Sequence, residues 1–491
     1  MIALTAAEVA ELTGGRLLAG TGSTEVTGPV VIDSRAAVPG SLFVALPGER
    51  VDGHDFAAAA VAAGAGVVLG ERAVDLDPAA ALVVVDDAVA ALGRLARGVL
   101  DRLRARPPHA GVTGPLVVGV TGSQGKTTTK DLLAHVLAPG GPVVAPVGSF
   151  NNEIGAPLTV LRADEATASL VVEMGARGIG HIATLCAIAP PDVGVELVVG
   201  SAHAGEFGSL EATALAKGEL VEALTADDLA VLNADDDRVA AMASRTRARV
   251  LTFGRSPGAD VRAVDVELDD RARARFTLQH AGADAPVTLR LHGEHQVTNA
   301  LAAAAVALGT GRALTEVAAS LSTAEDLSPG RMQVVERADG VTVVHDAYNA
   351  NPDSVRAALK ALVGMATTPS GTRRTWAVLG EMLELGPASR DEHDVIGRLV
   401  VRLDVDQLLV VGAGARPIYT GAVMEGSWGE EAAFATDVDD ALEFLRPRLR
   451  PGDVVLVKSS NGAGLARLAT TLISTPTSTT DSTQATEASN S

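Results

Sequence analysis

Three observations predict an α/β protein of three domains followed by a tail. The chain has 491 residues, and at roughly 100–200 residues per domain about three domains are expected. Short apolar runs alternate with helical patterns along most of the chain, which is typical of doubly wound, mainly parallel sheets. One apolar run leads into a glycine-rich turn that opens a helix, an arrangement that suits the binding of phosphate.

The first domain is expected over residues 1–108. Residues Thr5 to Glu8 form a capping box pattern that opens a short helix, and Gly14 and Gly15 end it. Short strands and turns follow to about residue 50. The later elements complete an α/β unit and are expected at 57–63 (helix), 67–69 and 83–85 (strands) and 88–104 (helix). Pro107 and Pro108 break the last helix and indicate a linker.

A second domain is expected over 109–314 and a third over 315–474, with Gly309 to Gly311 near the boundary between them. The second has predicted strands at 116–121, 169–174, 193–199 and 229–232 and helices at 126–137, 209–224 and 298–308. The third has predicted strands near 342–346, 375–379, 408–411 and 453–458. Residues 475–491 are rich in Ser and Thr with almost no apolar side chains, so this tail is expected to be disordered.

Composition argues against several classes of protein. The net charge is −20, so no broad basic face is expected, and nucleic acid is not an expected partner. No apolar run reaches the ~18 residues that a membrane span needs, so no membrane insertion is expected. The start of the chain lacks the pattern of a signal peptide, and the one cysteine, Cys186, suits a reducing compartment. We therefore expect a cytoplasmic protein.

Residues 119–130 form the most informative segment, because a strand, a glycine-rich turn and a helix follow one another there. Such a turn exposes amide groups to an anion, Lys126 adds a full charge, and Thr127 can place a hydroxyl group on Mg²⁺. The glycines at 119 and 122 do not fit the strict Walker spacing, and a purely structural turn is the alternative. The segment predicts a nucleoside triphosphate site, and the loop residues are Gly122, Ser123, Gln124, Gly125, Lys126, Thr127 and Thr128.

Two more strands of this domain end in side chains that suit a metal ion. Glu173 ends the strand at 169–174, and His203 follows the strand at 193–199. The carboxyl ends of parallel strands meet at one edge of a sheet, so Thr127, Glu173 and His203 converge there if the strands are neighbours. Carboxylate, hydroxyl and imidazole groups could then bind Mg²⁺ that bridges phosphates. Glu173 as an ordinary strand-end acid and His203 as a hydrogen-bonding loop residue are the plainer alternatives.

Three other polar residues have structural interpretations when they are judged by sequence alone. Lys217 fits a solvated lysine of the helix at 209–224. Asn233 precedes Asp235 and Asp236 in a turn that can cap a helix, and Asn299 can cap the alanine-rich helix that follows it.

These segments resemble the ATP-dependent Mur ligases of peptidoglycan precursor synthesis, from about residue 30 to 470. The shared motifs are at 121–128, 203–209 with Lys217, 233–236 and 293–300, where Gln296 stands in the place of a frequent Asn. The runs at 151–158, 346–354 and 379–386, with His393 after them, are typical of the members that add the dipeptide D-Ala-D-Ala. The runs at 33–35, 40–43 and 52–56 are shared with the members that add the third peptide residue. Residues 455–460 resemble a Val-Lys-Gly-Ser run, with Ser459 in the glycine place.

The resemblance implies an amide ligase that joins D-alanyl-D-alanine to UDP-N-acetylmuramoyl-tripeptide with ATP. An acyl phosphate is the implied intermediate, and UDP-N-acetylmuramoyl-pentapeptide, ADP and phosphate are the products. The implied domains are an N-terminal domain for the UDP substrate, a central P-loop domain, and a C-terminal Rossmann-like domain that closes over ATP and binds the dipeptide. The resemblance also implies a monomer.

The resemblance further assigns roles to single residues. Lys126 and the loop amides hold the β- and γ-phosphates, Thr127 and Glu173 bind one Mg²⁺, and His203 helps with a second. Lys217 corresponds to a lysine that CO₂ converts to a carbamate, whose anionic oxygens can bind Mg²⁺ where an ammonium group would repel it. The remaining assignments are to ATP (Asn233, Asn299, Arg331 and Asp346), to the uridine nucleotide (Ser34 and Arg35) and to the peptide substrates (Asn151, Asn152, Glu153, Tyr348 and Asn349).

Two alternatives remain open. A ligase that adds diaminopimelate or lysine to the dipeptide precursor typically carries an Asp-Asn-Pro or Asp-Asp-Pro run in its third domain, and this chain has neither there. A P-loop nucleotide switch without ligase chemistry would read guanine with an Asn-Lys-x-Asp run, whereas Asn233 is followed by Ala.

Overall fold

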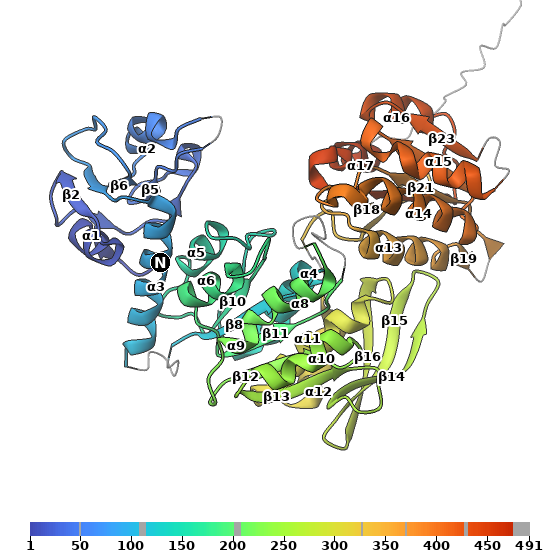
Figure 1. Cartoon of the computed structure of the whole chain (residues 1–491), viewed down its shortest axis with the longest axis horizontal. Coiled ribbons are helices and arrows are strands. Elements are labelled where there is room, and N and C mark those ends of the chain that lie inside the picture. The colour runs from blue at the N-terminus through green and yellow to red at the C-terminus, as the bar shows by residue number, and fades with distance from the viewer. Residues whose placement is uncertain are drawn as a thin grey trace, which may run out of the picture. The chain divides into compact units, whose positions relative to one another are not determined.

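The computed structural model describes residues 1–48, 51–107, 114–200, 208–325, 328–368, 371–426 and 431–474. The chain divides into two compact units. The first holds residues 1–269, 273–328 and 384–387, and the second holds 270–272, 329–383 and the chain from 388 onwards. Both units are mixed α/β structures, which confirms the predicted class (Figure 1). Within the described ranges no helix is long and apolar enough to cross a membrane.

A five-stranded sheet forms the N-terminal part of the first unit, in the order β2-β7-β6-β5-β4. Its strands are β2 (Arg16–Ala19), β4 (Val30–Val31), β5 (Leu42–Val44), β6 (Val67–Gly70) and β7 (Ala81–Val84), and all pairs are parallel except β2 with β7. Helices α1 (Ala6–Thr13) and α3 (Ala88–Ala105) pack on one face, and α2 (Ala57–Ala62) packs on the other. The predicted capping box is confirmed, because Thr5 and Glu8 exchange both hydrogen bonds.

A nine-stranded sheet forms the centre of the first unit, in the order β16-β15-β14-β13-β12-β11-β8-β10-β9. Its strands are β8 (Leu116–Thr121), β9 (Val143–Val144), β10 (Ser169–Glu173), β11 (Val193–Glu196), β12 (Leu229–Asn233), β13 (Arg249–Gly254), β14 (Val261–Leu268), β15 (Arg273–His280) and β16 (Ala283–His292). The strands from β9 to β14 run parallel, as the sequence predicts, and β8 lies between β10 and β11.

The last two strands, β15 and β16, pair antiparallel with their neighbours and extend the sheet beyond β14 (Figure 1). Strands β14, β15 and β16 were not predicted from the sequence, because buried and exposed residues alternate in them and no continuous apolar run marks them. A two-residue turn, Ala281 and Gly282, joins β15 to β16. Both residues are exposed and have positive φ angles of 50° and 79°.

Helices cover both faces of the central sheet. Helices α4 (Lys126–Leu137), α11 (Gln296–Gly309) and α12 (Leu314–Thr323) pack on one face. The other face is covered by α5 (Gly155–Val160), α6 (His181–Ile188), α9 (Glu219–Glu222) and α10 (Asp237–Ala241), with α3 of the N-terminal part against α5 and α6. One continuous apolar core therefore joins the two sheets of the first unit.

The single helix predicted at 209–224 is two helices, α8 (Leu210–Lys217) and α9, which meet at Gly218. The guanidinium group of Arg245 donates to the carbonyl oxygens of Ala214 and Leu215 at 2.9 and 2.8 Å. A Cβ atom at Gly218 would lie 2.0 Å from this group. Arg245 thus forms hydrogen bonds with carbonyl groups in the last turn of α8, next to the residue at which α8 ends and α9 begins.

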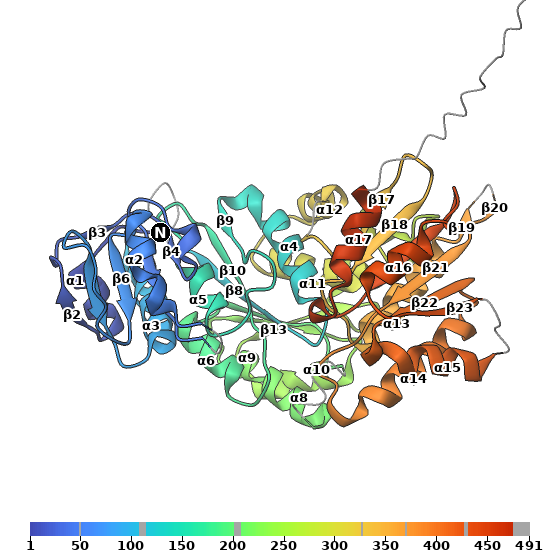
Figure 2. The same cartoon turned by 90° about the horizontal axis from the view of Figure 1, so that it is seen from above.

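A six-stranded sheet forms the core of the second unit, in the order β17-β18-β24-β21-β22-β23. Its strands are β17 (Gln333–Glu336), β18 (Thr342–Asp346), β21 (Thr375–Leu379), β22 (Gln407–Val411), β23 (Ala432–Ala435) and β24 (Val454–Lys458), and only β17 is antiparallel. Helices α16 (Val438–Leu445) and α17 (Leu465–Ser474) cover one face, and α13 (Pro352–Gly364), α14 (Ser389–Arg402) and α15 (Arg416–Glu425) cover the other (Figure 2). The four predicted strands of this part are confirmed.

The domain boundaries at 108 and 314 remain a prediction, as does disorder of residues 475–491, which lie outside the described residues.

The single cysteine, Cys186, is buried in α6. Its Sγ atom lies 3.7 Å from Sδ of Met174. Burial in this apolar position raises the pKa of the Cys186 thiol to about 12, so the group is a neutral thiol at physiological pH.

Candidate functional site

The turn between β8 and α4 requires glycine at two positions. Gly122 has φ 152° and Gly125 has φ 84°, values that other residues rarely adopt. A Cβ atom at Gly122 would lie 2.8 Å from Cβ of Leu197, and one at Gly125 would lie 2.4 Å from Oδ1 of Asn299. The backbone can therefore form this tight turn only because both side chains are absent. Gly125 is also the N-cap of α4, so the amide groups at the start of that helix open towards the turn.

Hydrogen bonds tie the turn to the end of β11. The Ser123 amide group donates to the carbonyl oxygen of Val198 at 2.8 Å, and the Gly200 amide group donates to Oγ of Ser123 at 2.9 Å. The Lys126 ammonium group bends back and donates to the carbonyl oxygen of Gly122 at 2.7 Å. A positively charged side chain and the N-terminus of a helix are thus held together at the turn, which is the arrangement that binds a phosphate chain.

Glu173 lies beside the turn, because β10 is the direct neighbour of β8 and Glu173 is in register with Val120. This confirms the predicted adjacency of these strand ends. The Thr127 hydroxyl group donates to Oε2 of Glu173 at 3.1 Å, and Nδ2 of Asn151 donates to Oε1 at 2.8 Å. A buried carboxylate and a hydroxyl oxygen within hydrogen-bond distance are ligands that suit Mg²⁺.

His203, the third expected ligand, lies outside the described residues, as do residues 201–207 around it. Among the residues that the structure describes, no three His, Cys, Asp or Glu side chains lie close enough to hold a metal ion. The metal-binding roles of Thr127, Glu173 and His203 therefore remain predictions.

Lys217 is not the solvated lysine that its sequence position suggests. It ends α8 and is fully buried, with 1% of its surface exposed. Burial and the positive charge of Lys126 together lower the pKa of Lys217 to about 7, against an opposing effect of the Glu196 carboxylate. Solvation was the wrong interpretation because the helix turns this side chain towards the sheet, where Lys126 and Glu196 act on it.

Glu196 is a buried acidic residue at this site that was not predicted from the sequence. It ends β11 in register with Thr121 and Leu232 and has no exposed surface. Neither carboxylate oxygen has a hydrogen-bond partner within the described part of the chain. Burial raises the pKa of Glu196 well above its usual value, and the charge of Lys217 opposes that rise. The available signal was a single acidic residue inside the otherwise apolar run from Val193 to Val199.

The side chains expected near adenine make internal hydrogen bonds. Asn233 donates from Nδ2 to the carbonyl oxygen of Leu197 at 2.8 Å and thereby links β12 to β11. The turn after it caps α10 through Asp236, as the sequence alone suggests. Asn299 donates from Nδ2 to Oε1 of Gln296 at 2.8 Å, and its Oδ1 atom lies against Gly125. Asn299 thus packs against the backbone of the phosphate turn at Gly125.

Two histidines of the resemblance motifs have structural hydrogen bonds. Nε2 of His54 accepts from the Glu71 amide group at 2.8 Å, and Nε2 of His393 accepts from the Met382 amide group at 2.9 Å. Both rings therefore carry their proton on Nδ1, which points at Asp52 in the first case and at the carbonyl oxygen of Ser389 in the second.

The residues expected to bind substrate lie at three places. Ser34 and Arg35 form a short 3₁₀ turn in which Arg35 pairs with Asp33 at 2.6 Å and lowers the pKa of Asp33 to about 2. Asn152 accepts from the Gly155 amide group, at the start of α5, at 2.9 Å, and Glu153 beside it is exposed.

The remaining expected residues belong to the second unit. The guanidinium group of Arg331 lies 4.5 Å from the centre of the Tyr348 ring. Asp346 ends β18, and its carboxylate accepts from Nζ of Lys458 at 2.6 Å. Asn349 follows in the same loop and offers its carbonyl oxygen to Nζ of Lys458 at 3.0 Å.

Comparison with known families identifies the chain. Three family profiles match it: "Mur ligase family, catalytic domain" at 29–99, "Mur ligase middle domain" at 120–307, and "Mur ligase, glutamate ligase domain" at 330–461. A curated relative, the UDP-N-acetylmuramoyl-tripeptide–D-alanyl-D-alanine ligase of Mycobacterium tuberculosis, is 52% identical over 97% of this chain and 99% of its own length. The chain belongs to the Mur ligase family.

Solved structures of other Mur ligases have the same fold as this one. MurF from Acinetobacter baumannii superposes with a TM-score of 0.84 at 30% identity, over 97% of this chain and all of that one. MurF from Thermotoga maritima, solved in complex with ADP, superposes with a TM-score of 0.75 at 31% identity, over 90% of this chain and 96% of that one.

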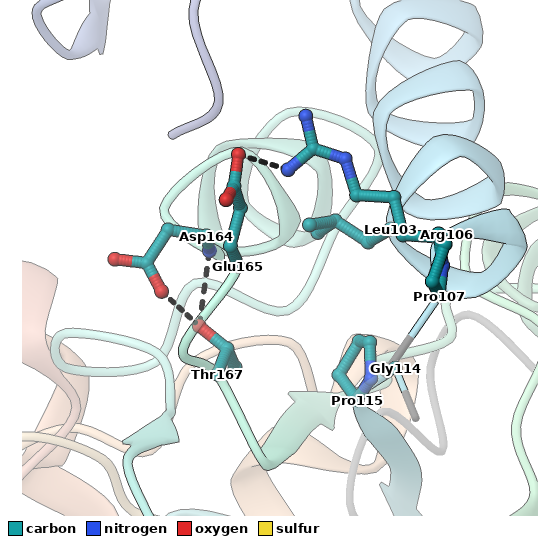
Figure 3. Close-up of a pocket in the computed structure, with 8 residues that line it drawn as sticks. All are labelled: Leu103, Arg106, Pro107, Gly114, Pro115, Asp164, Glu165 and Thr167. Atoms are coloured by element: carbon teal, nitrogen blue, oxygen red, sulfur yellow. Dashed lines mark hydrogen bonds and ion pairs between the residues drawn. The ribbon is translucent and has the colours of Figure 1, made fainter. Parts of the chain in front are cut away.

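A small hollow lies at the end of α3 in this Mur ligase, and none of its lining residues belongs to the phosphate turn (Figure 3). The residues that line it are Leu103, Arg106, Pro107, Gly114, Pro115, Asp164, Glu165 and Thr167. Arg106 forms an ion pair with Glu165 across it. This ion pair links the N-terminal part to the central sheet and carries no chemistry of the phosphate site.

Proposed function

We propose that this Mur ligase joins D-alanyl-D-alanine to UDP-N-acetylmuramoyl-tripeptide in the cytoplasm, with ATP as the second substrate. The products are UDP-N-acetylmuramoyl-pentapeptide, ADP and phosphate. The observation that carries the proposal is the pairing of Thr127 with Glu173 at a phosphate turn, in a chain that is 52% identical to a ligase of this name along nearly its whole length.

The reaction needs activation of a carboxylate, because an amide does not form from a carboxylate and an amine in water. In the first step a carboxylate oxygen of the tripeptide attacks the γ-phosphorus of ATP, and ADP leaves. In the second step the amine of the dipeptide attacks the carbonyl carbon of the acyl phosphate, loses a proton, and phosphate leaves. Lys126 and the α4 amides contribute by holding and neutralising the phosphates in position.

The residues at the turn fit a magnesium ion, since Thr127 and Glu173 supply a hydroxyl and a carboxylate oxygen at one point. When bound, Mg²⁺ supplies positive charge next to the phosphates. We further propose that His203 and a carbamate on Lys217 hold a second ion. The burial of Lys217 and its lowered pKa support the carbamate, because only a neutral amine reacts with CO₂.

The other assignments are proposals of the same kind. They give the uridine nucleotide to Ser34 and Arg35, ATP to Asn233, Asn299, Arg331 and Asp346, and the peptide substrates to Asn151, Asn152, Glu153, Tyr348 and Asn349. The addition of diaminopimelate or lysine is less well supported, because relatives from Mycobacterium tuberculosis and Escherichia coli, which match 97% and 95% of this chain at 52% and 34% identity, are named for the dipeptide.

An ADP-release assay tests the proposed function. With ATP, Mg²⁺ and UDP-N-acetylmuramoyl-tripeptide, we expect ADP release to depend on added D-Ala-D-Ala. The Lys126→Ala variant, which removes the charge at the phosphates, should lose at least ~100-fold of this activity. Release with diaminopimelate and the dipeptide precursor, and none with D-Ala-D-Ala, would favour the other ligase. Release that needs no acceptor would favour a nucleotide switch.

A further inference from the structure

Lys458 is a fully buried lysine at the carboxyl end of β24, the strand between β18 and β21. Its ammonium group donates to Oδ2 of Asp346 at 2.6 Å and to the carbonyl oxygen of Asn349 at 3.0 Å. The other oxygen of Asp346 accepts from the Met332 amide group at 3.1 Å. One side chain therefore connects the end of β18 with the loop that follows it.

Ser460, two residues further on, connects the same loop to the loop after β21. Its hydroxyl group accepts from the Leu383 amide group at 2.9 Å and donates to the carbonyl oxygen of Ala350 at 3.3 Å. Its own amide group donates to the carbonyl oxygen of Glu381 at 2.9 Å. The end of β24 thus fixes the loops on both sides of it, at the edge of a parallel sheet where ligands usually bind.

A buried ion pair of this kind is a weak source of stability. Removing two charges from water costs about as much as their attraction returns, and apolar residues of similar volume often do equally well. Burial lowers the pKa of Lys458, and the charge of Asp346 and its hydrogen bond oppose this effect. The hydrogen bonds of Lys458 hold the loop after β18 in one conformation. An apolar pair of residues could not make these hydrogen bonds.

We propose that Lys458 is a positioning residue for the acceptor: it fixes the loop from Asp346 to Asn351 in the conformation that receives the incoming dipeptide. This inference rests on the proposed function, because it takes that loop, with Tyr348 and Asn349, as the dipeptide-binding loop. Lys458 acts through the backbone and Asp346 and does not itself touch the substrate.

The test compares the KM values of the full chain for D-Ala-D-Ala and for UDP-N-acetylmuramoyl-tripeptide, each measured at saturating ATP, because Asp346 is also a residue proposed to bind ATP. Lys458→Met keeps the length of the side chain and removes its charge, and Lys458→Arg keeps the charge. We expect Lys458→Met to raise the KM for D-Ala-D-Ala at least ~10-fold, since small misplacement of binding groups is enough for such a loss. The KM for UDP-N-acetylmuramoyl-tripeptide should stay within about twofold, and Lys458→Arg should recover part of the loss.

A control variant at the opposite end of the same strand separates positioning from stability. Arg374 donates to Asp453, just before β24, at 2.6 Å, and Asp453 is buried like Asp346. Arg374→Met should lower the melting temperature without changing the KM for D-Ala-D-Ala. If Lys458→Met does not fold, Ser460→Ala replaces it, with an expected rise of a few-fold in the same KM.

The outcomes are distinct. If the wild-type chain shows no release of ADP that depends on D-Ala-D-Ala, the proposed function fails. If the wild type behaves as proposed but neither Lys458→Met nor Ser460→Ala changes the KM for D-Ala-D-Ala, the positioning role is wrong. It is equally wrong if Arg374→Met raises that KM as much as the Lys458 variant does.

Discussion

Buried polar side chains set the local chemistry of both units: Thr127 with Glu173 and Lys217 in the first, and Lys458 with Asp346 in the second. The closeness of Thr127 and Glu173 was predictable from the sequence, because Thr127 comes shortly after one buried strand, Glu173 ends another, and adjacent parallel strands end at one edge. The burial of Lys217 could not be deduced, because a lysine on a short helix is usually solvated and only the packing of α8 decides otherwise. The pairing of Lys458 with Asp346 depends on which strands are neighbours, and 112 sequence positions separate the two.

The lowered pKa of Lys217 predicts a bicarbonate dependence that changes with pH. Only the neutral amine forms a carbamate, and a pKa of about 7 means that the neutral fraction rises about tenfold between pH 6 and pH 8. Enzyme freed of CO₂ should regain ADP release on addition of bicarbonate, and regain more of it at pH 8 than at pH 6. Labelled bicarbonate should give a carbamate signal in the ¹³C NMR spectrum.

Variants of Lys217 provide the control for this prediction. Lys217→Arg retains a charge but cannot form the carbamate, so it should be inactive and insensitive to bicarbonate. Lys217→Ala should be inactive and should regain activity with small carboxylates. An active Lys217→Ala variant, or a wild type indifferent to bicarbonate at both pH values, would refute the carbamate.

At the scale of elements, the sequence indicated buried parallel strands well and amphipathic strands poorly. Strands such as β8 and β24 are continuous apolar runs and were predicted at almost their observed bounds. Strands β14 to β16 alternate between exposed and buried residues and are also joined by short turns, so their pattern was not distinguished from loops. The prediction of helix boundaries was wrong where a side chain distant in sequence binds the helix carbonyl groups, as Arg245 does next to Gly218.

Two glycine N-caps allow a matched test of the phosphate turn. Gly125 before α4 and Gly180 before α6 have similar φ angles of 84° and 92°. A Cβ atom at Gly125 would lie 2.4 Å from Asn299, whereas one at Gly180 would meet nothing within 4 Å. Gly180→Ala should therefore show only the backbone cost, about 1–2 kcal/mol of unfolding free energy. Gly125→Ala should in addition weaken ADP binding at least ~10-fold, because the turn must move.

Isothermal titration calorimetry with ADP and Mg²⁺, together with chemical denaturation, checks this pair of variants. Equal ADP affinity for the two variants would mean that the contact between Gly125 and Asn299 does not shape the phosphate site.

Each of the two units of the chain has its own apolar core. Tryptophan fluorescence reports on the unfolding of only one of these units. Trp376 lies in β21 of the second unit, and Trp428, which lies outside the described residues, falls in the sequence range of the same unit. The phosphate turn lies in the first unit. Proteins with separate cores often unfold in more than one step.

Calorimetry and tryptophan fluorescence should therefore respond differently to nucleotide. ADP and Mg²⁺ at about 100 times Kd stabilise the state that binds them by about 2.7 kcal/mol, so a calorimetric transition should rise by about 5 °C. The fluorescence transition should rise by less, because only Arg331 and Asp346 of the second unit are assigned to the nucleotide, whereas the phosphate turn belongs to the first unit. The Lys126→Ala variant should show neither shift, and an equal shift of both signals in the wild type would mean that the two units unfold together.

The burial of Cys186 makes this chain convenient for site-specific labelling. The native thiol is shielded and almost entirely protonated, so a maleimide reagent at neutral pH will react with it very slowly. A second cysteine, introduced at the exposed β15–β16 turn in place of Ala281, would then be the group that takes the label. A fluorophore could be attached at a chosen point without first removing the natural cysteine.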